Sequence, residues 1–334
     1  MLLKGGPRTQ ILQTKRCLEE CGVNVSLFES WKDLRSETID LIHLFGANVG
    51  TYHLAREIHK IGIPFVVTPI FYSRHSAPFV RAVIGVNQAL RSAARGLWTD
   101  YKFVRDICFW SKSVLPNTFR ECRLVEKGLG VPNEKIMMVP NGVEERFYRA
   151  DPALFNRTYG LENFILNVGH IGPERKNVLK LIQALKRINN PSVIIGRIED
   201  NAYGRSCILE AKKNPRLLIL DSLPYDSELL ASAYAASDVF ALPSQFETPG
   251  IAALEAALAG AKIVITKYGG TEEYFGSLAE YVEPTSVELI HHGILAALNR
   301  EKNSALREHM RQEFLWERVA EKTLHVYERV LSSI

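Results

Sequence analysis

Cysteine is scarce in this chain, and its spacing offers no metal or disulfide framework. Five cysteines are scattered through 334 residues, with no Cys-x-x-Cys pair and no Cys/His pattern of metal-ligand spacing. An odd, dispersed set is typical of reduced and mostly buried thiols. We therefore expect a cytoplasmic protein with free cysteines.

Long hydrophobic runs are also missing. No stretch of about 18 apolar residues occurs, which is the length that a membrane-spanning helix needs. The first six residues, Met1 to Gly6, lack the apolar core of a signal peptide. We expect neither a transmembrane segment nor export.

Two common nucleotide-binding motifs are absent. No Gly-x-Gly-x-x-Gly follows a predicted strand, and no Gly-x4-Gly-Lys-Ser/Thr pattern occurs. These absences argue against a dinucleotide-dependent dehydrogenase and against a P-loop NTPase. A net charge of +4 is too small to make nucleic acid the expected partner.

Acidic residues are absent from one long segment. Residues 58–99 contain no Asp or Glu but include Arg74, Arg81, Arg91 and Arg95. From Pro78 to Trp98 the pattern is that of a basic amphipathic helix, which suits an anionic membrane surface. An ordinary packed helix with a solvated arginine face explains the same pattern, and both interpretations stay open.

The rest of the chain alternates between apolar runs and helical patterns, which predicts an α/β protein. Its length suits two domains of ordinary size. Strands are predicted near residues 1–6, 23–27, 40–46, 63–68, 113–115 and 135–139, and in the second half at 164–168, 193–196, 217–221, 238–242, 262–266 and 279–282.

The stretch from Ala241 to Glu273 has the most informative pattern. An apolar strand ends before Pro243, and a helix is predicted to start near Pro249, which a first turn tolerates. The backbone N–H groups between Thr248 and Ile251, apart from Pro249, which has none, would then face an anion such as a diphosphate. Gly250 would let the backbone approach that ligand closely.

Glu255 lies in the middle of this helix, and its neighbours are almost all apolar. A buried carboxylate without a partner is costly, so we expect Glu255 to bind a ligand. In the simpler alternative Glu247 caps the helix and Glu255 lies on its surface.

A second phosphate-binding pattern begins the second half of the chain. A predicted strand over 164–168 leads into Gly169, and Arg175 and Lys176 come just before the next predicted helix. A glycine turn and a cation at a helix start are suited to phosphate. A solvated charge run is the alternative.

These elements together resemble a known family. Glu247-x7-Glu255 with Gly250 between them, followed by Gly269-Gly270-x-x-Glu273, resembles the signature of family 4 retaining glycosyltransferases, such as bacterial and archaeal group 1 enzymes. The resemblance implies a GT-B fold, in which two Rossmann-like domains face a central cleft. It implies an acceptor domain over 1–145, a nucleotide-sugar domain over 146–317, and a C-terminal helix over 318–334 that returns to the first domain.

The resemblance also implies roles for individual residues. Glu247 and Lys176 would act on the donor sugar and its diphosphate, and Glu255 would hold the ribose. The full expected donor-binding set is Gly6, Gly169, Arg175, Thr248, Pro249, Gly250, Ile251, Glu255 and Gly270. No metal is expected, because positive groups take its place. Two positions depart from the family pattern, namely Ile70, where a His is common, and His170, where an Arg is usual.

The expected function is transfer of a sugar from a UDP-, GDP- or ADP-linked donor to a hydroxyl acceptor with retention of configuration. The acceptor would be a glycan, a lipid-linked saccharide or a small molecule, as in polysaccharide biosynthesis at the inner membrane face. The alternatives are another sugar-nucleotide enzyme, such as an epimerase, and a non-catalytic nucleotide-sugar-binding protein.

Overall fold

A computed structural model describes residues 5–32, 34–90 and 99–333. The chain forms two compact units, one made of residues 1–141 and 316–334 and the other of Gly142–Leu315. The division into domains given above, with boundaries at 145/146 and 317/318, remains a prediction. Each unit is described by itself below.

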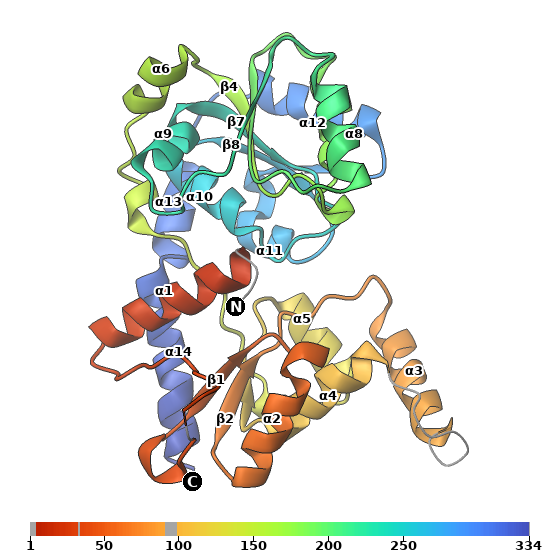
Figure 1. Ribbon diagram of the computed structural model, residues 1–334, viewed down its shortest axis with the longest axis vertical. Helices are drawn as coiled ribbons and strands as arrows, with labels where there is room; N and C mark the ends of the chain where they lie inside the picture. The colour runs from red at the N-terminus through yellow and green to blue at the C-terminus, as the bar shows by residue number, and fades with distance from the viewer. Residues whose placement is uncertain (1–4, 33, 91–98, 334) are drawn as a thin grey trace. The chain divides into compact units, whose positions relative to one another are not determined.

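The first unit is built on a short parallel sheet with strand order β1-β2-β3 (Figure 1). Ile42 pairs with Phe65 and Val66 pairs with Ser113. All four β2 residues are buried, as expected for a central parallel strand covered on both faces. The strands are β1 (Ile42–Phe45), β2 (Phe65–Thr68) and β3 (Ser113–Val114). The helices are α1 (Gly6–Glu20), α2 (Val49–Ile61), α3 (Ala77–Leu90), α4 (Asp100–Trp110), α5 (Phe119–Arg123) and α14 (Trp316–Leu331), with short turns η1 (Ser36–Thr38), η2 (Leu124–Gly128) and η3 (Asn133–Lys135).

The C-terminal helix α14 packs against α1, which crosses it within this unit (Figure 1). The half-buried His43 ring ties it to the sheet, because Nδ1 lies 2.7 Å from the Tyr327 hydroxyl of α14 and Nε2 lies 2.9 Å from Thr68 Oγ1 of β2. Burial lowers the pKa of His43 to about 3. The ring is therefore neutral at physiological pH and serves as a structural link.

Three predicted strands of this unit are wrong or untested. Residues 1–4 of the first lie outside the described residues, and Gly6 already begins α1. Residues 23–27 form no strand, and 135–139 contribute only a single bridge between Val114 and Ile136. At 23–27 the backbone has no partner strand, and at 135–139 the partner strand β3 is only two residues long, neither of which alternation alone reveals.

The second unit contains a six-stranded parallel sheet with order β6-β5-β4-β7-β8-β9. Numbered within the unit this is 3-2-1-4-5-6, the doubly wound order of a Rossmann-like sheet. The strands are β4 (Phe164–Val168), β5 (Ser192–Ile195), β6 (Leu217–Leu220), β7 (Ser237–Leu242), β8 (Lys262–Thr266) and β9 (Glu280–Val282). The helices are α6 (Ala153–Tyr159), α7 (Val178–Leu185), α8 (Ala202–Ala211), α9 (Glu228–Ala236), α10 (Ile251–Ala259), α11 (Thr271–Phe275), α12 (Val287–Asn299) and α13 (Ala305–Glu313), with turns η4 (Glu145–Phe147), η5 (Glu174–Lys176) and η6 (Gly276–Leu278).

Two buried clusters cover the two faces of this sheet. One contains side chains from α9, α10 and α13, and the other contains side chains from α7, α8 and α12. The sheet therefore has helices on both sides, as Figure 1 shows for this unit. The order of the strands reverses between β4 and β7, the neighbouring parallel strands that begin the two halves of the sheet. Ligands of open α/β sheets bind at such a switch point, beyond the carboxyl ends of the strands.

Among the residues described above, no helix is both long and apolar enough to cross a membrane.

Candidate functional site

The loops that follow β4 and β7 bring three charged side chains together. Lys176 Nζ lies 2.7 Å from Glu247 Oε1, and Arg175 Nη1 lies 3.5 Å from the same oxygen. Arg175 Nη1 also donates to the Phe246 carbonyl at 2.9 Å. The two loops are joined directly, because the Gln245 amide donates to the Arg175 carbonyl at 2.8 Å. Residues 71 positions apart in sequence thus share one site.

The charge state of Glu247 follows from this arrangement. Its side chain is only 7% exposed, and burial by itself opposes ionisation. The positive charges of Lys176 and Arg175 outweigh that effect, so the pKa of Glu247 lies below its ordinary value. Glu247 is therefore a buried carboxylate that holds two cations at the edge of the sheet.

Asn177 holds the Lys176 loop in place. It is buried and adopts a left-handed conformation with φ 57°. Its Nδ2 donates to the Pro243 carbonyl at 2.8 Å and to the Pro284 carbonyl at 2.7 Å. These carbonyls come from the segments that follow β7 and β9. One side chain therefore fastens the Lys176 loop to two other loops at the carboxyl edge.

The Gly269-Gly270 pair lies against the backbone of Glu247. The Glu247 amide donates to the Tyr268 carbonyl at 3.1 Å, and the Gly270 amide donates to the Glu247 carbonyl at 3.0 Å. Gly269 has φ 104°, and a β-carbon there would lie 1.8 Å from the Glu247 carbonyl oxygen. Only glycine permits this contact. The pair therefore orients Glu247 through its main chain.

The start of α10 differs from the prediction. The helix begins at Ile251, with Gly250 as its N-cap at φ 86°, so Thr248 and Pro249 lie in the preceding loop and not in a first turn. The first intrahelical bonds run from Ala253 and Leu254 to the Gly250 carbonyl. The left-handed Gly250 interrupts the helical backbone, which is why the helix cannot begin earlier. Its N-terminal amides are those of Ile251 and the residue after it.

Glu255 is buried in α10, but it has a partner. The Tyr234 hydroxyl of α9 donates to Glu255 Oε2 at 2.7 Å. Burial raises the pKa of Glu255 to about 7, and the Tyr234 hydrogen bond and Arg146 oppose that rise. The alternative in which Glu255 lies on the helix surface is wrong, since the residue is only 4% exposed.

A polar cluster surrounds this carboxylate. Arg146 donates to the Tyr225 carbonyl and has its guanidinium 5.0 Å from the Tyr225 ring centre. The Tyr225 hydroxyl is buried and has no hydrogen-bond partner within the described ranges. Burial raises the Tyr225 pKa, and the nearby Glu255 carboxylate raises it further. A buried, unsatisfied hydroxyl beside a carboxylate is a polar group available to a ligand.

The turn after β4 places Gly169 and His170 at the same edge of the sheet. The Gly169 amide donates to the Ile195 carbonyl at 3.0 Å. His170 Nδ1 lies 3.7 Å from Glu199 Oε1. His170 therefore faces an acidic neighbour, whereas Arg175 reaches Glu247.

Two positions singled out from the sequence belong to the other unit. Gly6 is the first residue of α1, after the bend at Gly5. Ile70 follows β2 and adopts φ 51°. A β-branched residue rarely has a positive φ, and the conformation costs about 1–3 kcal/mol. The amide of the next residue, Phe71, donates to the buried Glu121 carboxylate at 2.6 Å, which holds this turn.

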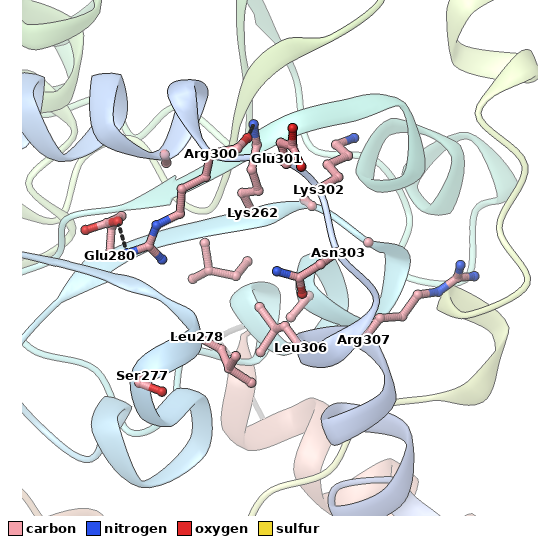
Figure 2. A pocket seen from close by; sticks show the side chains of 15 residues that line it. Lys262, Ser277, Leu278, Glu280, Arg300, Glu301, Lys302, Asn303, Leu306 and Arg307 are labelled. Atoms are coloured by element: carbon pink, nitrogen blue, oxygen red, sulfur yellow. Dashed lines mark hydrogen bonds and ion pairs between the residues drawn. The ribbon is translucent and has the colours of Figure 1, made fainter.

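A cavity of about 300 Å³ lies elsewhere in the second unit, beside the amino ends of β8 and β9 (Figure 2). None of the predicted site residues lines it. Arg300 points to Glu280 at 2.6 Å, and Lys262 lies 3.0 Å from Asp238. These cations already have acidic partners, so the cavity differs in character from the Glu247 site.

Sequence reasoning assigned no role to three residues of this site. Asn177 directly precedes α7, a position where Asn is a common helix cap. That position was the one local indication that Asn177 has a structural role. Tyr234 and Arg146 gave no local signal, because their proximity to Glu255 depends on how η4, α9 and α10 pack together.

Comparison with known proteins shows a likeness to one family. Residues 155–313, which fall within the second unit, match the family model described as glycosyl transferases group 1. The match covers just under half of the chain.

A curated relative extends the likeness beyond the group 1 region. D-inositol 3-phosphate glycosyltransferase of Geodermatophilus obscurus is 29% identical over an alignment of 280 positions, which covers 78% of this chain and 61% of the relative. The chain thus spans about three fifths of the length of that curated relative.

Solved structures share the fold of the whole chain. Sucrose-phosphate synthase from Thermosynechococcus elongatus has a TM-score of 0.76 at 17% identity, covering 99% of this chain and 94% of that one. Anabaena HepE in complex with UDP and glucose has a TM-score of 0.72 at 16% identity, covering 99% and 96%. These neighbours have the GT-B fold, and this chain shares that fold.

Proposed function

We propose that this protein is a glycosyltransferase that moves a sugar from a nucleotide-diphosphate donor to a hydroxyl acceptor with retention of configuration. The observation that carries the proposal is the pairing of Lys176 and Arg175 with Glu247 at the carboxyl edge of the β4–β7 switch point. The match to the group 1 family model and the UDP-glucose complex of a structural neighbour, Anabaena HepE, support it.

The chemistry of the site suits a leaving diphosphate. The Lys176 ammonium has three donors, and only one is needed for Glu247, so the others are available to phosphate oxygens. The guanidinium of Arg175 and the N-terminal amides of α10 add positive potential nearby. In the step that we propose, the bond from the sugar anomeric carbon to the diphosphate breaks and the acceptor oxygen bonds to that carbon. The acceptor proton passes to a phosphate oxygen of the leaving group.

The remaining predicted residues have supporting roles in this proposal. Glu255 and Tyr225 would face the nucleoside, since they form the polar cluster between α9 and α10. Thr248, Pro249, Gly250 and Gly270 shape the loop around Glu247, and Gly169 lines the turn after β4. The participation of Gly6 stays a prediction. We expect no metal in the reaction, because Lys176 and Arg175 supply the positive charge that the diphosphate needs.

Incubation with UDP-, GDP- and ADP-sugars and a panel of hydroxyl acceptors tests the activity. We expect a glycosylated product from at least one donor, with the donor's anomeric configuration retained by NMR. Interconversion of the nucleotide sugar without an acceptor would instead indicate an epimerase. Tight donor binding with no turnover of any donor would indicate a binding protein.

Site variants test the assignment of residues. Glu247→Gln and Lys176→Ala should each lower the transfer rate at least about 100-fold, the size of effect seen when a group that stabilises a transition state is removed. Lys186→Ala is the matched control, because Lys186 is an exposed lysine of the same unit that pairs with Glu210 at 3.9 Å. Near-normal rates in Glu247→Gln would refute the assignment.

The partner on the acceptor side is proposed from α3. Phe79 and Val86 are 47% and 58% exposed on this helix, and its Arg81 is exposed as well. The segment from 58 to 99 has no acidic residue to repel anionic lipid. Arg91 and Arg95, named with Arg81 above, lie outside the described residues. We propose that α3 contacts the cytoplasmic face of an anionic membrane.

Vesicle sedimentation tests this contact. Vesicles with phosphatidylserine should bind the protein in a salt-sensitive manner, and Phe79→Ser with Val86→Ser should weaken binding. Leu209→Ser, which changes a side chain 63% exposed on α8, should leave binding unchanged. Equal binding to neutral vesicles, or no binding, would favour a soluble acceptor.

A further inference from the structure

One turn of α12 carries three metal-ligating side chains outside the candidate site. Glu288, His291 and His292 each place a ligand atom within 4.8 Å of the other two. Glu288 Oε1 and His292 Nε2 are 2.9 Å apart. Residues three and four positions apart share one helix face, so this proximity follows from the helix geometry.

A second observation concerns His291. Its side chain is only 8% exposed, and its Nδ1 has no hydrogen-bond partner within the part of the chain that the structure describes. A buried imidazole nitrogen without a partner is costly, and metal coordination is one way in which histidine is satisfied. Glu288 and His292 are 49% and 61% exposed, so an ion would reach the group from solvent and keep a water ligand.

From this geometry we propose that Glu288, His291 and His292 form a binding site for a divalent transition-metal ion. Two imidazoles and one carboxylate are ligands for Zn²⁺, Ni²⁺ or Cu²⁺, whereas Mg²⁺ and Ca²⁺ prefer oxygen alone. Three protein ligands leave one position of a tetrahedral ion for water. The site is independent of the proposed transfer, since none of its ligands belongs to the Glu247 site.

One neighbour competes with the ion. Arg187, which follows α7, contacts both carboxylate oxygens of Glu288. Both side chains are about half exposed, at 50% and 49%, so the ion pair is weak enough to be displaced. Removing Arg187 frees the carboxylate and removes a repelling positive charge. Arg187→Ala should therefore bind the metal more tightly, by about threefold to tenfold.

Metal titration of the full chain tests the site. Stripped protein should develop the visible absorption of tetrahedral Co²⁺ and bind Zn²⁺ competitively. Zn²⁺ should raise the melting temperature by about 3 °C or more, because it binds only folded protein. His292→Ala and Glu288→Gln should abolish both effects. His292 and Glu288 are the main test positions because they are exposed, whereas a substitution at the buried His291 can unfold the protein. His291→Gln, the more conservative change, tests that third ligand.

The controls decide between this site and adventitious binding. His325→Ala removes an exposed histidine of α14 and should leave the Co²⁺ spectrum and the Zn²⁺ shift unchanged. If wild type shows no visible Co²⁺ band, or if His292→Ala responds to Zn²⁺ as wild type does, the proposal is overturned. Unchanged or weaker binding in Arg187→Ala would also overturn the site as described, because Arg187 and the ion would then not share Glu288.

Discussion

The Asn177 amide offers a sensitive test of how the candidate site is held together. Its Nδ2 donates two hydrogen bonds, to Pro243 and Pro284, across 66 and 107 residues of chain. The donor is buried, and its loop also carries Lys176. We predict that Asn177→Gly destabilises the protein and loosens the Lys176 loop, although glycine accepts the left-handed conformation without strain.

The magnitude follows from the two hydrogen bonds. Each contributes a net 0.5–1.5 kcal/mol, and their loss leaves two carbonyl groups short of a partner, so Asn177→Gly should cost about 2–3 kcal/mol in unfolding free energy. Asn177→Ala loses the same hydrogen bonds and must also place a β-carbon in the left-handed conformation, at φ near 57°. This strain lowers the unfolding free energy by about 1 kcal/mol more. The order of stability should therefore be wild type, then glycine, then alanine.

Asn163 provides the matched control. It is also an asparagine with positive φ, 52°, but it is exposed. Asn163→Gly should change the unfolding free energy by no more than about 0.5 kcal/mol. Urea denaturation of the wild type and the three variants, followed by far-ultraviolet circular dichroism, measures each difference without reference to enzyme activity.

The kinetic consequence rests on the proposed function. A looser Lys176 loop should raise the KM for the donor and lower kcat in Asn177→Gly, with Asn163→Gly unchanged. Equal midpoints for Asn177→Gly and Asn163→Gly would refute the reasoning, because the two buried hydrogen bonds would then contribute nothing measurable.

Three further predictions concern other parts of the site. The folded pKa of Glu255 is about 7 and its unfolded value is near 4.5, so its contribution to the unfolding free energy is fully present below pH 4.5 and falls by about 3 kcal/mol as pH rises to 7. Glu255→Gln should therefore flatten the curve of unfolding free energy against pH over this range. An unchanged curve would contradict the raised pKa. Gly269→Ala should lower the unfolding free energy by about 3 kcal/mol or more, since its β-carbon would clash with the Glu247 carbonyl. Gly160→Ala, at φ 65° with open space around it, should lower it by only about 1 kcal/mol. Similar losses of unfolding free energy in both variants would mean that the positive φ, and not the clash, accounts for the effect. Transfer should persist in EDTA, because Lys176 neutralises the leaving group, and loss of activity that Mg²⁺ restores would overturn the metal-free proposal.

Much of the second unit could be predicted from the sequence. Its central strands β4, β5, β7 and β8 are mostly buried, so each appears as a short apolar run such as Lys262–Thr266, and the helices between them show their own periodicity. The first unit was harder. Its strands are two to four residues long, and an apolar pattern at 23–27 looks the same whether or not a partner strand is present.

The sequence by itself determined the order of the βα units and the kinds of residue at the strand ends, because buried parallel strands and local turn chemistry leave local signals. Only the tertiary structure decided the partners. Lys176 meets Glu247 across 71 residues, and Tyr234 meets Glu255 across 21. These contacts depend on strand order and helix packing, so no local pattern encodes them. The Glu255 pKa follows from burial and that same packing.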